Sequence, residues 1–70
     1  MATLQIYEED RSATLFDGSI VITFNNGSWT RRKYGFSRNG ITTILKRFGY
    51  YRKSPWVKTD GGWEAKFIKA

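Results

Sequence analysis

The residues best suited to chemistry form a basic block without acidic neighbours. Nine cations and no acid lie between Gly18 and Thr59, whereas all six acids fall at or before Asp17 or at or after Asp60. The nine cations are Arg31, Arg32, Lys33, Arg38, Lys46, Arg47, Arg52, Lys53 and Lys58. In a compact domain these charges share the surface, and a field of one sign attracts polyanions. The formal net charge of the whole chain, +6, understates the charge of this block.

Aromatic residues are interleaved with the basic block. They are Trp29, Tyr34, Phe36, Phe48, Tyr50, Tyr51 and Trp56. This mixture suits nucleic acid, because cations contact phosphates and ring faces stack on exposed bases. Core packing is the competing role: we assign it to Phe48, which completes an apolar helix stripe, and favour it for Trp29 and Phe36. Tyr50 and Tyr51 are adjacent and should point in different directions, so we expect one of them to be exposed.

We therefore predict a small basic nucleic-acid-binding module that uses a cationic, aromatic surface between Trp29 and Trp56, with DNA and RNA both open. The predicted site residues are Arg31, Arg32, Lys33, Tyr34, Arg38, Lys46, Arg47, Tyr51, Arg52 and Lys53. The alternative is a small protein-interaction or inhibitor domain that docks on an acidic surface of a partner protein, because such a surface attracts the same cations. The sequence does not distinguish between these partners, and it does not determine the oligomeric state.

Catalysis is not expected from this composition. The chain has no histidine and no cysteine, which removes the commonest general base, nucleophile and transition-metal ligands. Glu8, Glu9 and Asp10 are consecutive, and Asp17 and Asp60 are explained by turn chemistry. We expect no enzyme activity, no cofactor and no metal. No apolar run is long enough for a membrane span or a signal peptide, so we expect a cytoplasmic location and no membrane partner.

One short segment resembles a known signature. Arg32-Lys33-Tyr34-Gly35-Phe36 is similar to part of the signature strand of RNA-recognition motifs and cold-shock domains, with Tyr34 and Phe36 at the two stacking positions. Lys33 stands where that strand has glycine, and Ser37 where it has an aliphatic residue. The match covers five residues and the wider pattern of both families differs, so we assign no family. Three strands followed by a helix are also similar in layout to DNA-binding domains that lay a sheet in the major groove, where Arg31 and Lys33, or Arg32, would face the DNA.

The segment from Ser37 to Gly49 predicts a helix around which the domain is organised. Ile41, Ile44, Leu45 and Phe48 recur at i, i+3, i+4 and i+7, on one helical face. Asn39 is the preferred N-cap and Ser37 the competing one. Gly49 follows the last apolar residue, where helices often end in the left-handed conformation. We expect no other helix.

The rest of the chain predicts β-structure in one domain, residues 1–70. Strands are expected at Thr3–Glu8, Ser12–Phe16, Ser19–Asn25 and Ser28–Phe36, with two-residue type I′ turns at Asp17-Gly18 and Asn26-Gly27. We expect a three-stranded meander with the N-terminal strand added at an edge. Which face of the Ser28–Phe36 strand is buried stays open, because a one-residue shift in register moves every side chain to the other face.

A C-terminal hairpin is predicted from Trp56–Thr59 and Trp63–Lys69 around Asp60-Gly61-Gly62. A three-residue loop would place Lys58 opposite Glu64, and a two-residue loop would place Lys58 opposite Trp63. We prefer the first register, which matches opposite charges. The predicted fold class is α+β: an antiparallel meander of three to four strands, one amphipathic helix packed on the sheet, then a C-terminal hairpin.

Overall fold

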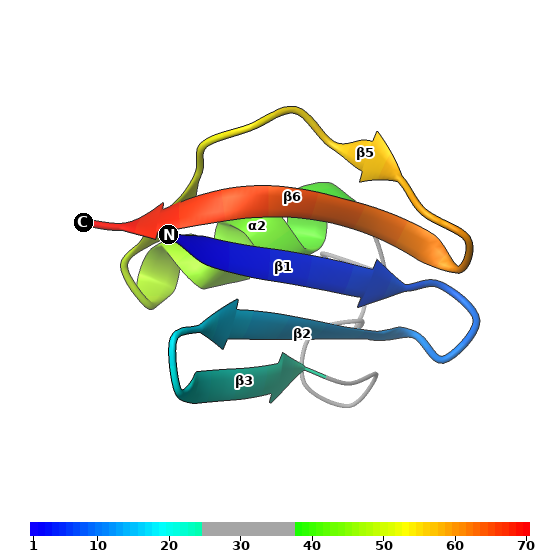
Figure 1. Ribbon diagram of the computed structural model, residues 1–70, viewed down its shortest axis with the longest axis horizontal. Coiled ribbons are helices and arrows are strands. Elements are labelled where there is room, and N and C mark those ends of the chain that lie inside the picture. Colours follow the sequence, from blue (N-terminus) through cyan, green and yellow to red (C-terminus); the bar gives the residue numbers. More distant parts are fainter. Residues whose placement is uncertain (25–37) are drawn as a thin grey trace.

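The structure, a computed structural model, describes residues 1–24 and 38–70. Within these residues an antiparallel sheet of six strands has one helix, α2, packed on one face, so the predicted α+β class is confirmed (Figure 1). The elements are β1 (Ala2–Tyr7), β2 (Ser12–Asp17), β3 (Ile20–Phe24), α2 (Arg38–Arg47), β4 (Tyr50–Arg52), β5 (Val57–Lys58) and β6 (Gly62–Lys69). Their order in the sheet is β3-β2-β1-β6-β4, and β5 also pairs with β6. The predicted strand Ser28–Phe36 and the turn at Asn26-Gly27 lie outside the described residues.

The N-terminal strand β1 lies in the middle of the sheet, so the predicted edge position is wrong. It pairs with β2 on one side and with β6 on the other. Its alternate residues Ala2, Leu4 and Ile6 are at most 2% exposed and form the centre of the core. The partner on the second side comes from the far end of the chain, and no local turn signal in the sequence indicates that pairing.

The hairpin between β2 and β3 turns one residue later than predicted. Asp17 pairs with Ile20, so the loop consists of Gly18 and Ser19, and Gly18 has a φ of 62°. Glycine takes this left-handed conformation without steric strain. The later turn pairs Leu15 with Ile22. Because the shift moves β3 by two residues along β2, the same side chains still face the core.

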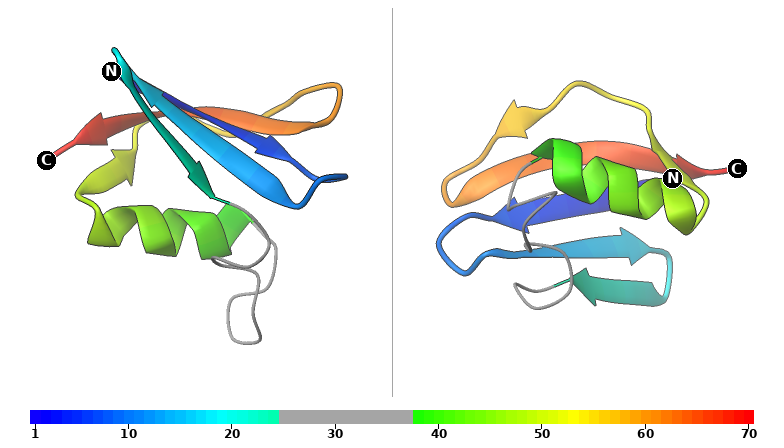
Figure 2. Two further views of the ribbon diagram at one scale, coloured as in Figure 1. Left: turned by 90° about the horizontal axis from the view of Figure 1, so that it is seen from below. Right: turned by 180° about the vertical axis from the view of Figure 1, so that it is seen from behind.

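The helix α2 covers one face of the sheet through Ile41 and Leu45, both 0% exposed (Figure 2). It begins at Arg38, so Asn39 lies inside the first turn and is not the N-cap. The competing N-cap, Ser37, lies outside the described residues. At the other end Gly49, with a φ of 88°, donates a 3.0 Å hydrogen bond to the Lys46 carbonyl, which confirms the predicted glycine stop.

Phe48 is not part of the core, contrary to the prediction. The helix ends at Arg47, and the positive φ of Gly49 turns the chain away. The 3.6-residue spacing therefore no longer determines where Phe48 points. Its side chain is 50% exposed and makes an edge contact with Phe24, with ring centroids 5.8 Å apart. The buried aromatic of this segment is Tyr50, at 2% exposure, whereas Tyr51 is exposed, as the adjacent pair predicted.

The C-terminal hairpin adopts the register that we did not prefer. Val57 pairs with Glu64 and Lys58 with Trp63, and the Thr59 amide donates to the Gly62 carbonyl. Trp63, Ala65 and Phe67 of β6 lie on the helix side of the sheet, because they pair with the core residues of β1. The residues of β4, which we did not predict to form a strand, pair with the last residues of β6.

Candidate nucleic-acid interface

The structure describes six of the predicted site residues and distributes them over two ends of the helix. Arg38 starts α2, and Lys46 and Arg47 form its last turn. Tyr51 and Arg52 belong to β4, and Lys53 follows directly. At 1.5 Å rise per residue, Arg38 lies about 12 Å along the helix axis from Lys46. Arg31, Arg32, Lys33 and Tyr34, together with Trp29 and Phe36, lie outside the described residues.

Arg38 is exposed, but its guanidinium group contacts a tryptophan ring of the same protein. Its guanidinium carbon lies 3.8 Å from the centre of the Trp63 ring, a close cation–π contact between the start of α2 and β6. The structure therefore does not group Arg38 with the cations at the far end of the helix.

Cations from three elements meet near the end of α2. We call this the basic end: Lys46, Arg47, Lys53, Lys66 and Lys69. Lys69 pairs with Tyr50 across β6 and β4, and its Nζ lies 5.4 Å from the centre of the Tyr50 ring. The Lys53 amide donates a 2.7 Å hydrogen bond to the Lys66 carbonyl. The basic end is thus assembled by strand pairing and not by the helix alone.

Lys66 and Lys69 were missed by the sequence prediction. They follow Trp56 and belong to the C-terminal segment that also contains Asp60 and Glu64, so they were not counted with the acid-free block. Only the pairing of β6 with β4 places them beside Lys53 and Tyr50. These two lysines could have been predicted from the sequence only if Tyr50–Arg52 had been recognised as a strand that pairs with the end of the chain.

The acidic turns lie together at the opposite end of the sheet. The Glu8 amide donates a 3.0 Å hydrogen bond to the Gly61 carbonyl, which joins the β1–β2 turn to the β5–β6 turn. This contact brings Glu8, Glu9 and Asp10 beside Asp60, at the end of the sheet away from the last turn of α2 (Figure 1). The protein is therefore electrically polarised along its strand direction.

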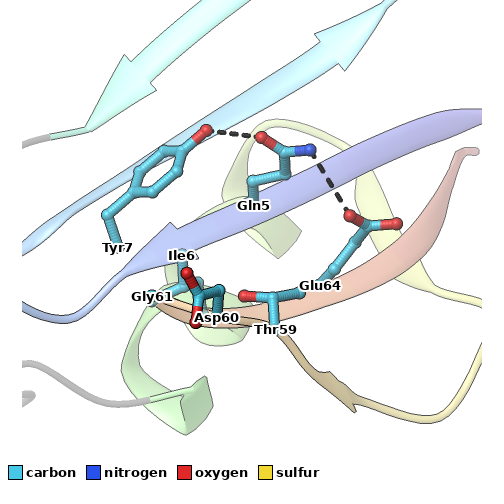
Figure 3. A pocket seen from close by; sticks show the side chains of 7 residues that line it. All are labelled: Gln5, Ile6, Tyr7, Thr59, Asp60, Gly61 and Glu64. Atoms are coloured by element: carbon cyan, nitrogen blue, oxygen red, sulfur yellow. Dashed lines mark hydrogen bonds between the residues drawn. The ribbon is translucent and has the colours of Figure 1, made fainter.

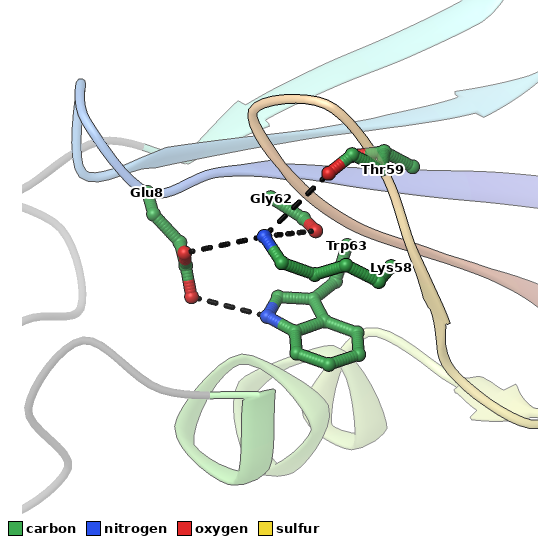
Figure 4. A network of polar contacts seen from close by, with 5 residues as sticks. All are labelled: Glu8, Lys58, Thr59, Gly62 and Trp63. Atoms are coloured by element: carbon green, nitrogen blue, oxygen red, sulfur yellow. Dashed lines mark hydrogen bonds and ion pairs between the residues drawn. The ribbon is translucent and has the colours of Figure 1, made fainter.

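A polar network centred on Glu8 fastens the acidic end (Figure 4). One carboxylate oxygen of Glu8 lies 3.8 Å from Lys58 Nζ, and the other accepts a 3.0 Å hydrogen bond from the Trp63 indole. Lys58 Nζ also lies within 3.5 Å of the Thr59 and Gly62 carbonyls and 5.4 Å from the Trp63 ring centre. Lys58 thus pairs with one of the four acids of these turns and lies away from the basic end.

One carboxylate, Asp17, lies on the side of the basic end, and it is occupied. The Tyr50 hydroxyl donates a 2.8 Å hydrogen bond to Asp17 Oδ2. This hydrogen bond, with the burial of the ring and the negative charge of Asp17, raises the pKa of Tyr50 above its usual value of 10.0. The contact joins β4 to the end of β2, and the Lys69 side chain lies against the same Tyr50 ring.

Two tryptophans, Trp56 and Trp63, make cation–π contacts with arginines of the same protein. Arg52 lies 5.7 Å from the ring centre of Trp56, which in turn makes an edge contact with the buried Phe67. The Arg52 guanidinium also donates a 2.6 Å hydrogen bond to the Ser54 carbonyl. Trp63 contacts Arg38 in the same way. These contacts favour a structural role for Trp56, whose role the sequence left open.

The face of the sheet opposite α2 is uncovered by any described element, and we call it the open face (Figure 2). Its exposed aromatic residues are Tyr7, Phe16 and Tyr51, between 36% and 42% exposed. Lys66 shares this face, and its Nζ donates a 2.8 Å hydrogen bond to the Thr3 hydroxyl. The alternation of Leu4 and Ile6 with Gln5 and Tyr7 in the sequence already placed Tyr7 away from the core.

A shallow pocket of about 220 Å³ opens on this face near the acidic end (Figure 3). It lies between Gln5, Tyr7, Glu64 and the turn at Thr59–Gly61. The Tyr7 hydroxyl donates to the Gln5 side-chain carbonyl, and Gln5 Nε2 donates to Glu64 Oε1 over 3.4 Å. The polar groups that line the pocket thus largely satisfy one another.

Comparison with known proteins adds no relative. The chain matches no protein-family model, and neither the curated proteins nor the solved structures contain a significant match. Within residues 1–24 and 38–70 no helix is long and apolar enough to cross a membrane. The same part of the chain contains no cluster of three or more acidic, histidine or cysteine residues placed to hold a metal ion.

Proposed function

We propose that this protein binds nucleic acid and that its basic end contacts the phosphates. The observation that carries the proposal is the separation of charge along the sheet. The acidic turns lie together, with Lys58 paired to Glu8, while the exposed Lys46, Lys53 and Lys69 lie at the far end. Clustered cations repel one another, and a bound polyanion relieves that repulsion. The release of the polyanion's own counterions favours binding further.

The helix dipole does not account for the whole cluster. The last turn of a helix favours cations by itself, so Lys46 and Arg47 alone would not indicate a ligand. Lys53, which directly follows β4, and Lys69 of β6 gain little from the dipole, whose effect is confined to the last turn. Positive charges from three segments of the chain thus lie in one region, and such a basic patch is typical of phosphate-binding surfaces.

The test is a salt titration of binding with matched charge variants. Affinity for a DNA or RNA oligonucleotide should fall with salt, with a log–log slope of about −0.7 to −0.9 for each phosphate contact. Lys46→Gln, Lys53→Gln and Lys69→Gln should each weaken binding and reduce the slope by about 1. Arg11→Asn is the control, because it removes the same charge from the β1–β2 turn at the acidic end. This variant should leave the slope unchanged.

Two outcomes would reject the proposal. Equal losses for Arg11→Asn and the three lysine variants would mean a general effect of net charge without a defined site. A folded protein that binds no DNA or RNA at about 50 mM salt, where phosphate contacts are strong, would leave an acidic protein surface as the partner.

A further inference from the structure

The open face collects most of the large apolar side chains that the described part of the chain exposes. Six such residues lie on this face: Tyr7, Phe16, Val21, Tyr51, Val57 and Ile68. Val21 pairs with Phe16, and Ile68 pairs with Tyr51. A solvated sheet face normally alternates to polar residues, so this exposure indicates a surface that is covered when the protein acts.

The three exposed rings stand on different strands and are spread across a broad surface. Phe16 is on β2 and Tyr51 on β4, with β1 and β6 between them. At about 4.8 Å per strand, the two rings are separated by roughly 14 Å across the sheet. Tyr7 lies on β1, beyond Gln5 from Thr3, the residue that pairs with Phe16. The rings therefore do not stack on one another and are available to separate groups of a ligand.

The strip between the rings is polar and carries little negative charge. It contains the hydroxyl groups of Thr3 and Thr14 and the amide of Gln5. Its acid, Glu64, accepts a hydrogen bond from Gln5. Lys66 lies in line with Thr3 and Phe16, and Lys53 joins it through a backbone hydrogen bond. The side of the face next to the basic end is thus positively charged.

We propose, building on the function proposed above, that the ligand is a single-stranded nucleic acid whose bases stack on Phe16 and Tyr51 while its phosphates reach the lysines of the basic end. Bases paired inside a duplex do not offer their faces to side chains, so rings spread over an open sheet favour an unpaired strand. The charge of the adjoining lysines complements the phosphate backbone. A base-stacking surface made of exposed rings beside a cationic border is the arrangement by which sheet proteins hold single strands without reading sequence.

The experiment measures affinity of the full chain for a dT 20-mer, a U 20-mer and a 20-base-pair duplex at one salt concentration. We expect both single strands to bind more tightly than the duplex. Phe16→Leu and Tyr51→Leu keep an apolar side chain but remove the ring. Each should weaken single-strand binding by about 5- to 150-fold, the equivalent of 1–3 kcal/mol for a stacked base, and leave duplex binding unchanged.

Phe48→Leu is the matched control. Phe48 is 50% exposed, more than either ring under test, but it lies next to the end of α2 and contacts Phe24 on the other side of the sheet. Its replacement should leave single-strand affinity unchanged. Backbone amide shifts of the native protein during titration with the dT 20-mer give a readout that needs no variant. They should change at Thr3, Phe16 and Tyr51 and not at Asn39 and Thr43, which are exposed on α2 before its last turn.

The outcomes separate this inference from the function on which it rests. Salt-dependent binding that is lost in the lysine variants but unaffected by Phe16→Leu and Tyr51→Leu would overturn the stacking surface and keep phosphate binding. Tighter binding to duplex than to single strands would also overturn it. Ring variants that abolish self-association in sedimentation, without a change in single-strand affinity, would assign the open face to a second copy of the chain. Absence of binding to all three probes would reject both proposals.

Discussion

The Tyr50 hydroxyl donates a 2.8 Å hydrogen bond to Asp17, and this contact ties the edge strand β4 to the end of β2. The two residues come from strands that are not neighbours, since β1 and β6 lie between them in the sheet. Tyr50 is buried on the helix side, at 2% exposure, directly after the left-handed Gly49. The bond therefore bridges the core beside the last turn of α2 and holds the basic end in place.

This contact predicts a loss of stability in alkaline solution. The pKa of Tyr50 is raised in the folded protein, mainly by the hydrogen bond to Asp17, so above pH 10 the folded state retains a proton that the unfolded state releases. The stabilisation is fully present below that pH and is lost as pH rises through the folded-state pKa. The difference in urea midpoint between the native protein and Tyr50→Phe should shrink as pH increases from 10 upward.

Tyr51→Phe is the control for this experiment, because it removes a hydroxyl from an exposed ring on the same strand. This variant keeps the hydrogen bond between Tyr50 and Asp17, so it should lose stability in alkaline solution as the native protein does. A Tyr50→Phe difference that stays constant would show that the Asp17 contact does not control ionisation of the ring.

A second prediction concerns the partner of Lys58. The register of β5 and β6 turns Lys58 to the side of Trp63, and its Nζ lies 3.8 Å from Glu8. A double-mutant cycle between Lys58→Ala and Glu8→Ala should give a coupling energy of about 0.2–1 kcal/mol, the range of exposed pairs. The cycle between Lys58→Ala and Glu64→Ala should give none, because these residues point to opposite faces. Equal coupling in the two cycles would contradict the register.

The Lys58 contact also shows what the sequence could reveal and what it could not. Matching Lys58 with Glu64 was reasonable for an isolated hairpin, but the carboxylate that Lys58 meets is Glu8, which only the pairing of β1 with β6 brings close. The helix, its glycine stop and the alternation in β1 and β2 are local patterns, and they were predictable from local spacing. The central place of β1 and the strand at Tyr50–Arg52 depend on partners distant in sequence.

The same distinction applies to the candidate site. Lys46 and Lys53 were candidates because charge composition is visible along the chain, and Tyr51 because aromatic residues are interleaved with the charges. The acid-free block could not identify Lys69 or Phe16, since their roles come from the neighbours that sheet pairing gives them. Nor could it show that Arg38 and Arg52 make cation–π contacts with tryptophan rings, because tertiary packing brings these groups together.

A third prediction separates the two ends of the apolar helix stripe. Leu45 is 0% exposed, so Leu45→Ala should lower the free energy of unfolding by about 2–5 kcal/mol through lost burial and a cavity. In a domain of this size such a loss leaves much of the protein unfolded at room temperature. Phe48→Ala, at a site that is 50% exposed, should lose only about 1–2 kcal/mol, although it removes a larger side chain. Urea unfolding of both variants measures the difference, and a larger loss for Phe48→Ala would place that ring in the core after all.

The last prediction tests the close approach of the C-terminal hairpin to the central strand. A Cβ built on Gly62 would lie 1.8 Å from the Ile6 carbonyl oxygen and 2.8 Å from its carbonyl carbon. These are backbone atoms inside the β1–β6 ladder, so they cannot yield without breaking the pairing of Tyr7 with Gly62. Gly62→Ala should therefore lower the free energy of unfolding by about 3 kcal/mol or more, at or beyond the upper end of overpacking effects.

Gly61 provides the matched control in the same turn. A Cβ at Gly61 would meet nothing within 4 Å, so Gly61→Ala should change stability by less than about 1 kcal/mol, in either direction. Gly62→Ala should also weaken the contact between the acidic turns, because the Glu8 amide bonds to the Gly61 carbonyl next to it. Amide hydrogen exchange at Glu8 would then be faster in Gly62→Ala than in Gly61→Ala. Similar stability and exchange in the two variants would mean that β6 does not approach β1 as closely as this register requires.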